Sequence, residues 1–240
     1  NETHVKALRD TGQTGQVENV MRQAFETNAV TPGMMDILQQ VYEEEKERPT
    51  GRRYRDFDQY VASLKSQKEA EALKAEIRKL IIDEPYQSFS LRDMEGRTVN
   101  STDWTGKVVV LDFWASWCFP CKSSFPGMQM AVDRYKDDPD VLFYFIDTME
   151  NSSGYEQKAR DYMQQKGFTF QVLFDGKTAS GKQNNQVFAQ MNAINHSMAI
   201  PRKMILKNGR VRLTQEGYGG SPSRLADEIT YAIEILKGEK

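Results

Sequence analysis

One segment restricts the fold of this chain more than any other: residues 107–122, KVVVLDFWASWCFPCK. Its first half is an almost unbroken apolar run, rich in β-branched residues, which is typical of a strand buried on both faces of a sheet. The chain then turns, and Pro120 favours the first turn of a helix that begins near Cys118. A strand buried in this way needs helices over both faces of its sheet, so the segment predicts an α/β fold.

After Glu84 the whole chain repeats this alternation of strands and helices. Asn208-Gly209 is a strong hairpin signal, and Ser221 with Pro222 can begin a last helix that runs to about Leu236. The other expected elements are two short strands around Glu95-Gly96, strands in VLFYFID and FTFQVLFD, a helix after the cysteines that Pro126 should kink, and helices over Tyr155–Lys166 and Gln186–Ala193. We expect residues 83–240 to form one domain built on a covered sheet.

Residues 1–82 have a different pattern, without strand-like runs or cysteines. They predict a small all-α N-terminal domain, with a helix over Val17–Phe25 and a longer helix from about Asp56 to Ile82. A further helix is expected between Thr31 and Pro49, capped by Thr31 and with Pro32 at its first position. The run Glu43–Arg48 is interpreted as a solvated helix end, with a partner surface left open, and His4 as incidental near a frayed terminus.

The composition excludes several classes of protein. The 240 residues are 39% hydrophobic and 28% charged, enough for a packed core under a soluble surface. The net charge is −2 and bases are mixed with acids, which speaks against a nucleic-acid partner. No apolar run is long enough to cross a bilayer. Because the chain starts at Asn1, we expect a trimmed form from which a signal peptide or membrane tether has been removed.

Both cysteines of the chain lie three residues apart, which allows a metal site, a structural staple or a redox centre. Two cysteines are at most half of a zinc site, and His4 and His196 have no ligand spacing to them, so no metal is expected. A disulfide across so short a loop removes little entropy from the unfolded chain and would stabilise the fold poorly. The redox interpretation is favoured.

The redox interpretation gives each position a task. Cys118 lies where the helix begins, and the free N–H groups and the dipole there favour its thiolate, so Cys118 is the expected attacking sulfur. Cys121, one turn later, can attack the resulting mixed disulfide and release the substrate. Pro120 fixes the backbone of the first turn without removing a needed hydrogen bond.

These residues carry a family resemblance. VVVLDFWASWCFPCK is similar to the active-site strand and helix of the thioredoxin superfamily, and FSLRDMEGRTVNSTDWTGK resembles the entry to its extracytoplasmic TlpA/ResA-like branch. MAIPRKMILKNGRV resembles the cis-proline segment of that family and its hairpin. The resemblance spans Tyr86–Lys240 and implies a thioredoxin-like fold, a central mixed sheet flanked by helices. It also implies a cis bond between Ile200 and Pro201 that faces the cysteines and offers backbone groups to an extended substrate.

The same resemblance assigns a role to Asp112, whose charge is costly inside an apolar strand. It implies that Asp112 takes and returns the proton of Cys121, with a carboxylate satisfied by neighbouring backbone as the alternative. Trp114 is interpreted as packing. The residues expected to contact substrate are Trp117, Phe119, Pro120, Ile200 and Pro201.

Three departures from the family pattern bear on this chemistry. Ser124 stands where ResA-like proteins often carry a glutamate, so a proton relay would depend on Asp112 alone. VLFYFI lacks the lysine that many thioredoxins place near the buried acid, so proton handling is expected to differ. Phe119 and Pro120 add no cation between the cysteines, which leans away from a strong oxidant.

The segment Gly176–Ser197 is polar and long for a connection, and it is either a lid over the substrate or a variable surface insertion. We favour the surface insertion. His196 lies near the expected cis-proline and is interpreted as an exposed loop residue.

The function that these features predict is thiol-disulfide oxidoreductase. The resemblance implies that the enzyme reduces disulfides in proteins outside the cytoplasm, in the bacterial periplasm or cell envelope. Its expected partners are protein disulfide or dithiol substrates and an upstream electron-donor protein, with no cofactor beyond the Cys118–Cys121 pair. The alternatives are an oxidase or isomerase of the same fold, a peroxide-reducing enzyme, and a partner-binding or chaperone-like protein that uses the helical N-terminal domain. The sequence alone names neither the substrate nor the donor.

Overall fold

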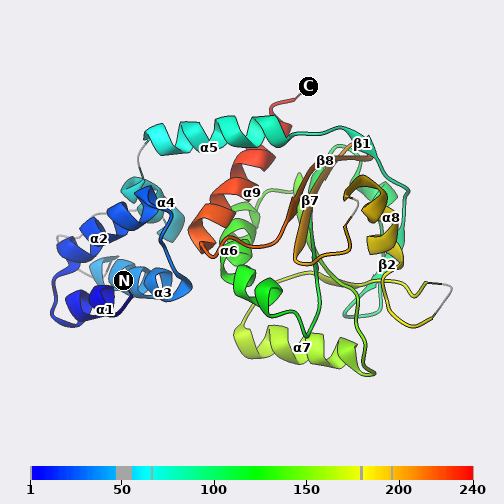
Figure 1. Ribbon diagram of the computed structural model, residues 1–240, viewed down its shortest axis with the longest axis horizontal. Coiled ribbons are helices and arrows are strands. Elements are labelled where there is room, and N and C mark those ends of the chain that lie inside the picture. Colours follow the sequence, from blue (N-terminus) through cyan, green and yellow to red (C-terminus); the bar gives the residue numbers. More distant parts are fainter. Residues whose placement is uncertain (1, 47–55, 66, 179–180, 196, 240) are drawn as a thin grey trace.

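The computed structural model describes residues 2–46, 56–65, 67–178, 181–195 and 197–239. Figure 1 shows a group of helices on the left and a helix-covered sheet on the right, with helix α5 running along the top from one to the other. In the described residues no helix is both long and apolar enough to span a membrane.

Four helices form the first group: α1 (Glu2–Asp10), α2 (Thr14–Glu26), α3 (Pro32–Lys46) and α4 (Phe57–Leu64). They bury one apolar core of their own, drawn from residues 5–64. The helices expected over Val17–Phe25 and after Thr31 are confirmed, and Thr31 caps α3 by accepting a hydrogen bond from the Met34 N–H at 3.2 Å. Helix α1 was not predicted, so His4 lies in a helix instead of a frayed end. The end of the run Glu43–Arg48 lies outside the described residues.

The single helix expected from Asp56 to Ile82 is wrong. Helix α4 ends at Leu64, Lys65 is extended, and α5 (Gln67–Leu80) starts anew. Leu64 belongs to the core of the first group, whereas Leu73 and Ile77 belong to the core beside the sheet. Both halves carry apolar residues at helical spacing, and that spacing does not tell which core they enter. The domain boundary at 82/83 stays a prediction, and α5 packs with the sheet part.

Eight strands form one mixed sheet in the order β1-β8-β7-β4-β5-β6-β2-β3. Strands β4, β5 and β6 are parallel, and the other pairings are antiparallel. The strands are β1 (Glu84–Pro85), β2 (Ser90–Asp93), β3 (Thr98–Asn100), β4 (Val108–Trp114), β5 (Val141–Asp147), β6 (Val172–Phe174), β7 (Arg202–Lys207) and β8 (Arg210–Glu216). This is the thioredoxin-like arrangement that the sequence predicted, with β4 at its centre.

Alternate residues of β4 enter two different cores. Val108 and Val110 face the core formed with α5, α6 (Phe119–Tyr135), α7 (Tyr155–Lys166) and α9 (Pro222–Lys237). Val109 and Leu111 face a second core, which includes residues of α8 (Gln186–Asn195) and Trp104 of the short 3₁₀ helix η1 (Ser101–Trp104). The strand is therefore covered on both faces, as its composition predicts.

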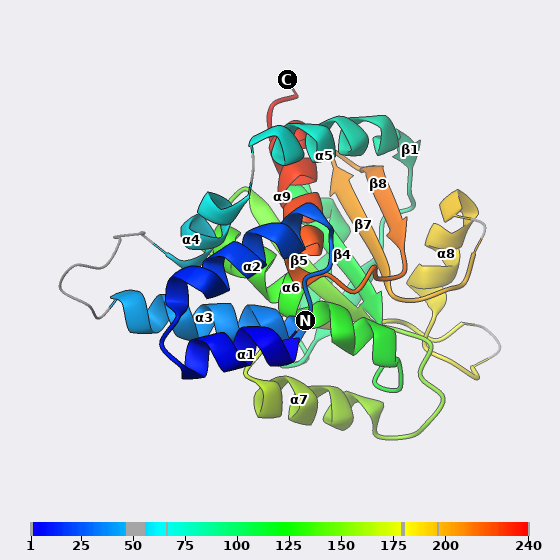
Figure 2. The ribbon, with the colours of Figure 1, turned by 60° about the vertical axis from the view of Figure 1, so that its left-hand side comes forward.

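Helix α6 carries the cysteines and packs closely on α9 (Figure 2). A Cβ on Gly127 would lie 2.6 Å from the carbonyl oxygen of Pro222, so only glycine permits this approach. Pro126 lies inside α6, which continues to Tyr135. The tight contact fixes the direction of α6, and with it the position of the cysteines at its beginning.

The interpretation of Gly176–Ser197 as a surface insertion is wrong for its central part. Asn184 is buried, and α8 places Val187, Phe188 and Met191 in the second core. The helix expected over Gln186–Ala193 is present as α8, but its helical pattern alone does not tell that it packs on the sheet.

Candidate active site

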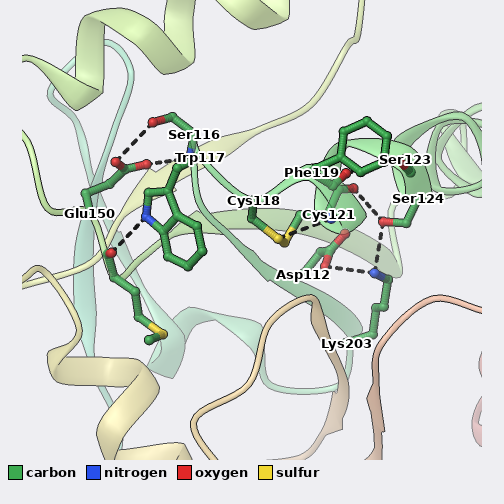
Figure 3. The surroundings of a disulfide bond; sticks show 11 residues. Asp112, Ser116, Trp117, Cys118, Phe119, Cys121, Ser123, Ser124, Glu150 and Lys203 are labelled. Carbon is green, nitrogen blue, oxygen red and sulfur yellow. Dashed lines mark hydrogen bonds and ion pairs between the residues drawn. A yellow bond between two sulfur atoms is a disulfide. The ribbon is translucent and has the colours of Figure 1, made fainter.

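The two cysteines lie where β4 gives way to α6. Cys118 is the N-cap residue of α6, and its sulfur accepts a hydrogen bond from the Cys121 N–H at 3.2 Å. A disulfide joins the two residues, whose Cα atoms are 5.3 Å apart (Figure 3). The position of Cys118 at a helix N-terminus, which supports a thiolate after reduction, is as the sequence predicted.

The bond between Ile200 and Pro201 is cis, as predicted. Strand β7 begins at the next residue and pairs antiparallel with β4, with Arg202 opposite Phe113. This register puts Pro201 at the level of Trp114, where the chain leaves β4 for the cysteines. The distant cis-proline segment is thereby brought to the site.

A buried ion pair lies in the sheet beneath the disulfide. Asp112 and Lys203 are opposite each other on β4 and β7, both fully buried, with the lysine Nζ 3.3 Å from the Asp112 Oδ1. Lys203 also donates a hydrogen bond to the Ser124 Oγ at 3.0 Å, and Ser124 donates to the Cys121 carbonyl oxygen at 2.8 Å. Figure 3 shows this chain of contacts running from Asp112 to the helix that carries Cys121.

Lys203 corrects two expectations. Because VLFYFI, which is β5, lacks a lysine, proton handling was expected to differ from that of thioredoxins, but β7 supplies a cation from the other side of β4. The alternative of a carboxylate satisfied by backbone is also wrong. Within the described part of the chain, the carboxylate oxygens of Asp112 accept no backbone hydrogen bond, and their ion-pair partner is the Lys203 ammonium. The available signal was a lysine between apolar residues in PRKMILK, which the hairpin register places beside β4.

Burial and charge set the protonation of Asp112. Burial raises the pKa of its carboxyl and the Lys203 charge lowers it, with a net pKa of about 6. The carboxyl is therefore mostly ionised at neutral pH, and its pKa is close enough to 7 for it to exchange a proton there.

The residues expected to touch substrate surround the disulfide unequally. Phe119 is 78% exposed and Trp117 is 49% exposed, and they lie on opposite sides of the sulfur atoms in Figure 3. Pro120 is exposed in the first turn of α6, whereas Ile200 is half-buried and Pro201 is buried. Trp114 is fully buried against Phe125, in agreement with a packing role. Substrate contact itself stays a prediction, and His196 lies outside the described residues.

A second buried polar cluster, which sequence reasoning missed, lies beyond the turn that precedes Cys118. Glu150 accepts hydrogen bonds from the N–H and the Oγ of Ser116, the latter at 3.0 Å. Asp147, Asp175 and Asn184 are buried around it. Burial, then the Glu150 charge, raises the pKa of Asp147 to about 9, and burial raises that of Asp175 to about 6. Asp147 is the last residue of β5, and the other residues lie in the connections after β4, β5 and β6, so no local motif joins them.

Comparison with known proteins gives the family of the chain. Residues 82–213 match the AhpC/TSA family. ResA of Geobacillus thermodenitrificans, a thiol-disulfide oxidoreductase, is 31% identical over 149 residues, which are 62% of this chain and 74% of that protein. The thioredoxin-like protein YneN of Bacillus subtilis is 32% identical over 96 residues, 40% of this chain and 55% of YneN.

A structure of a thiol:disulfide interchange protein DsbE from Chlorobium tepidum aligns with a TM-score of 0.48 at 27% identity, covering 63% of this chain and 96% of that one. The chain spans little more than half the length of YneN and of several Bacillus ResA proteins. The matched region of more than half the chain, the sheet order and the cysteine pair at the start of α6 agree with one another. The chain therefore belongs to the AhpC/TSA family, with a thioredoxin-like fold, as a relative of the ResA thiol-disulfide oxidoreductases.

Proposed function

We propose that this protein is a thiol-disulfide oxidoreductase that uses Cys118 and Cys121 as its reacting pair. The observation that carries the proposal is the disulfide in the first turn of α6, with a buried acid and its counter-ion directly beneath it. A staple across so short a loop would stabilise the fold little, whereas exchange chemistry needs this proximity.

In the reducing direction the Cys118 thiolate attacks one sulfur of a substrate disulfide. A mixed disulfide forms, and the other substrate sulfur leaves as a thiolate that takes a proton. Cys121 then loses its proton and attacks the Cys118 sulfur, which frees the second substrate sulfur. The substrate gains two electrons and two protons, and the enzyme ends in the disulfide state of the present structure.

Asp112 is the group proposed to accept the proton of Cys121. Its carboxylate lies in the strand below the pair, and its pKa of about 6 suits a base at neutral pH. Lys203 compensates the charge of this carboxylate in the apolar interior. Once this proton has left for solvent, Asp112 and Lys203 are again an ion pair.

A reductase is favoured over an oxidase or isomerase of the same fold. No cation stands between the cysteines to stabilise the thiolate of Cys118 beyond the helix N-terminus, since the intervening residues are Phe119 and Pro120. A less stable thiolate makes the disulfide form harder to reduce and the dithiol the stronger reductant. The equilibrium potential against glutathione tests the direction, and a value above that of glutaredoxins would support the oxidase.

The partners follow from this chemistry and from the family. We propose protein disulfides of the periplasm or cell envelope as substrates, and a dithiol protein as the donor that resets the pair. Cell fractionation of the full-length protein tests the compartment. A protein confined to the cytoplasm would contradict this part of the proposal and leave the chemistry intact.

Substrate trapping gives the decisive experiment. The Cys121→Ser variant should accumulate a mixed disulfide through Cys118, which a non-reducing gel and mass spectrometry would identify. Wild-type protein should reduce insulin with a dithiol donor, and Cys118→Ser should not. Equal insulin reduction by wild type and Cys118→Ser would end the proposal.

A further inference from the structure

The turn before Cys118 is hydrogen-bonded to the loop after β5. These two segments, residues 114–117 and residues 148–150, run beside each other and are joined over three successive positions. The bonds are Thr148 N–H to the Trp114 carbonyl at 2.8 Å, Ser116 N–H and Oγ to the Glu150 carboxylate, and Trp117 Nε1–H to the Met149 carbonyl at 3.1 Å. Figure 3 shows Glu150 and Trp117 on the side of the disulfide away from Asp112.

The backbone conformation of the loop 148–150 depends on contacts with residues outside the loop. Met149 has a φ of 57°, in the left-handed region that costs a non-glycine residue roughly 1–2 kcal/mol. Such a conformation persists only where the surroundings impose it. A bond network outside the loop must therefore keep Met149 in place.

Asn184 supplies that network from a segment far away in the sequence. It is 1% exposed, and its carbonyl accepts from the Met149 N–H at 2.9 Å. Its side-chain oxygen accepts from the Glu150 N–H at 2.7 Å, and its amide group donates to the carbonyl and to the Oδ1 of Asp147 at 3.0 and 3.1 Å. One side chain thus bridges the end of β5 and the loop after it.

Asp175 anchors this bridge to the sheet and to α8. Its carboxylate accepts from the N–H groups of Val187 and Phe188 in the first turn of α8, at 2.8 and 3.1 Å. It also accepts from the Thr148 Oγ1 at 2.9 Å. A continuous set of buried hydrogen bonds therefore links α8 with the turn before Cys118.

The charge state of the network fits this role. Glu150 lies near two titratable groups, Asp147 at the end of β5 and Tyr155 on α7, and Asp147 and Tyr155 in turn lie near Asp175 after β6. With a pKa of about 9, Asp147 is neutral at pH 7. Tyr155 is neutral at this pH like any tyrosine, and burial raises its pKa further. Asp147 therefore places no second negative charge beside the Glu150 side chain that accepts from Ser116.

We propose that Glu150 and Asn184 are positioning residues for thiol-disulfide exchange. They hold the turn 115–117 so that Cys118 caps α6 with its sulfur at the helix N-terminus, where the thiolate is favoured. This rests on the proposed function in so far as Cys118 is the attacking sulfur. None of the hydrogen bonds that Glu150 and Asn184 make in this network involves a sulfur atom.

The test measures the reactivity of Cys118 itself, without a protein substrate. The reduced protein is alkylated with iodoacetamide over a range of pH, which yields the rate constant and pKa of Cys118. Asn184→Ala should lower the rate at pH 7 by about tenfold, the equivalent of one pKa unit. Asn151→Ala, an exposed asparagine next to Glu150, is the matched control and should stay within twofold of wild type.

Glu150 is tested by a pair of variants. Glu150→Gln keeps an oxygen that can accept from the Ser116 N–H, so its rate should stay within about threefold of wild type. Glu150→Ala removes the acceptor and should lose about tenfold, although it also removes a negative charge that opposes the thiolate. A role through charge alone would instead make both variants faster than wild type, which would overturn the proposal.

A variant of equal volume covers the case in which Asn184→Ala does not fold. Asn184→Asp keeps the acceptor for the Glu150 N–H but, when ionised, cannot donate to Asp147. Its alkylation rate relative to wild type should therefore fall as the pH rises. A constant ratio near one would contradict positioning by Asn184, as would an Asn184→Ala rate equal to that of the control.

These outcomes are separate from the proposed function. If wild-type protein fails to reduce insulin, the function proposal fails, while the order of alkylation rates still tests whether the network positions Cys118. If insulin is reduced and the variants all react like wild type, only the positioning proposal fails.

Discussion

Two buried polar clusters lie on opposite sides of the same disulfide, and they balance their charges in different ways. Beneath Cys121, the carboxylate of Asp112 is balanced by the ammonium of Lys203. Beyond the turn to Cys118, Asp147 is balanced by a proton, since burial and the charge of Glu150 raise its pKa to about 9. A charge-balanced acid with a pKa of about 6 can move protons at neutral pH, whereas an acid that keeps its proton can only hold structure.

The largest effect is expected from removing the cation. Lys203→Met leaves Asp112 buried without a partner and should lower the free energy of unfolding by about 3–5 kcal/mol at pH 7. Urea unfolding of the oxidised protein measures this. The double variant Lys203→Met/Asp112→Asn should recover much of the loss, and Lys166→Met, at an exposed position, is the control. An unchanged midpoint would show that the two charges are not coupled.

Removing the acid should affect the second chemical step. Asp112→Asn should slow resolution of the mixed disulfide by about 100-fold, the usual contribution of a positioned base. In wild type the rate of this step should rise with pH and level off above about 6, because the carboxylate is the active form. Stopped-flow measurement of substrate release gives both quantities. An inflection near pH 6 that survives in the variant would assign it to another group.

In the second cluster, replacing a buried acid should raise the free energy of unfolding instead of lowering it. Asp147 is protonated in the fold and ionised in the unfolded chain at pH 7, so the wild type loses stability as the pH rises from about 4 to about 9. Asp147→Asn cannot ionise and should be about 2 kcal/mol more stable than wild type at pH 7. Urea unfolding at pH 5, 7 and 9 should show a gap that widens with pH. A destabilised variant at every pH would mean that Asp147 is ionised in the native protein.

The smallest effect is expected at the exposed surface beside the disulfide. Phe119 is 78% exposed, so Phe119→Ala should change the free energy of unfolding by no more than about 0.5 kcal/mol. If Phe119 contacts substrate, KM for a protein disulfide should rise about threefold with kcat unchanged. Comparing the kinetic change for insulin with that for a small disulfide distinguishes loss of substrate contact from a change in redox potential. An equal change for both substrates would point to the redox potential instead of contact.

Much of the first cluster could be predicted from sequence, and almost none of the second. Asp112 is conspicuous as the one acid in an apolar strand, and Cys118 and Cys121 define their own spacing. Lys203 was missed because the lysine was looked for in VLFYFI, which is β5, whereas β7 on the other side of β4 supplies it. Glu150 and Asn184 escaped because each is an ordinary polar residue in its own loop, and only the packing of α8 brings them together.

The chain by itself determined the strand that leads to a cysteine pair, the hairpin at Asn208-Gly209 and the helical character of its first part, because local periodicity, turn residues and short spacings specify these features. Only the tertiary structure decided where α5 packs, which strand supplies the cation and which loop supports the attacking cysteine. Those contacts join residues distant in sequence, and their burial sets the protonation of each acid.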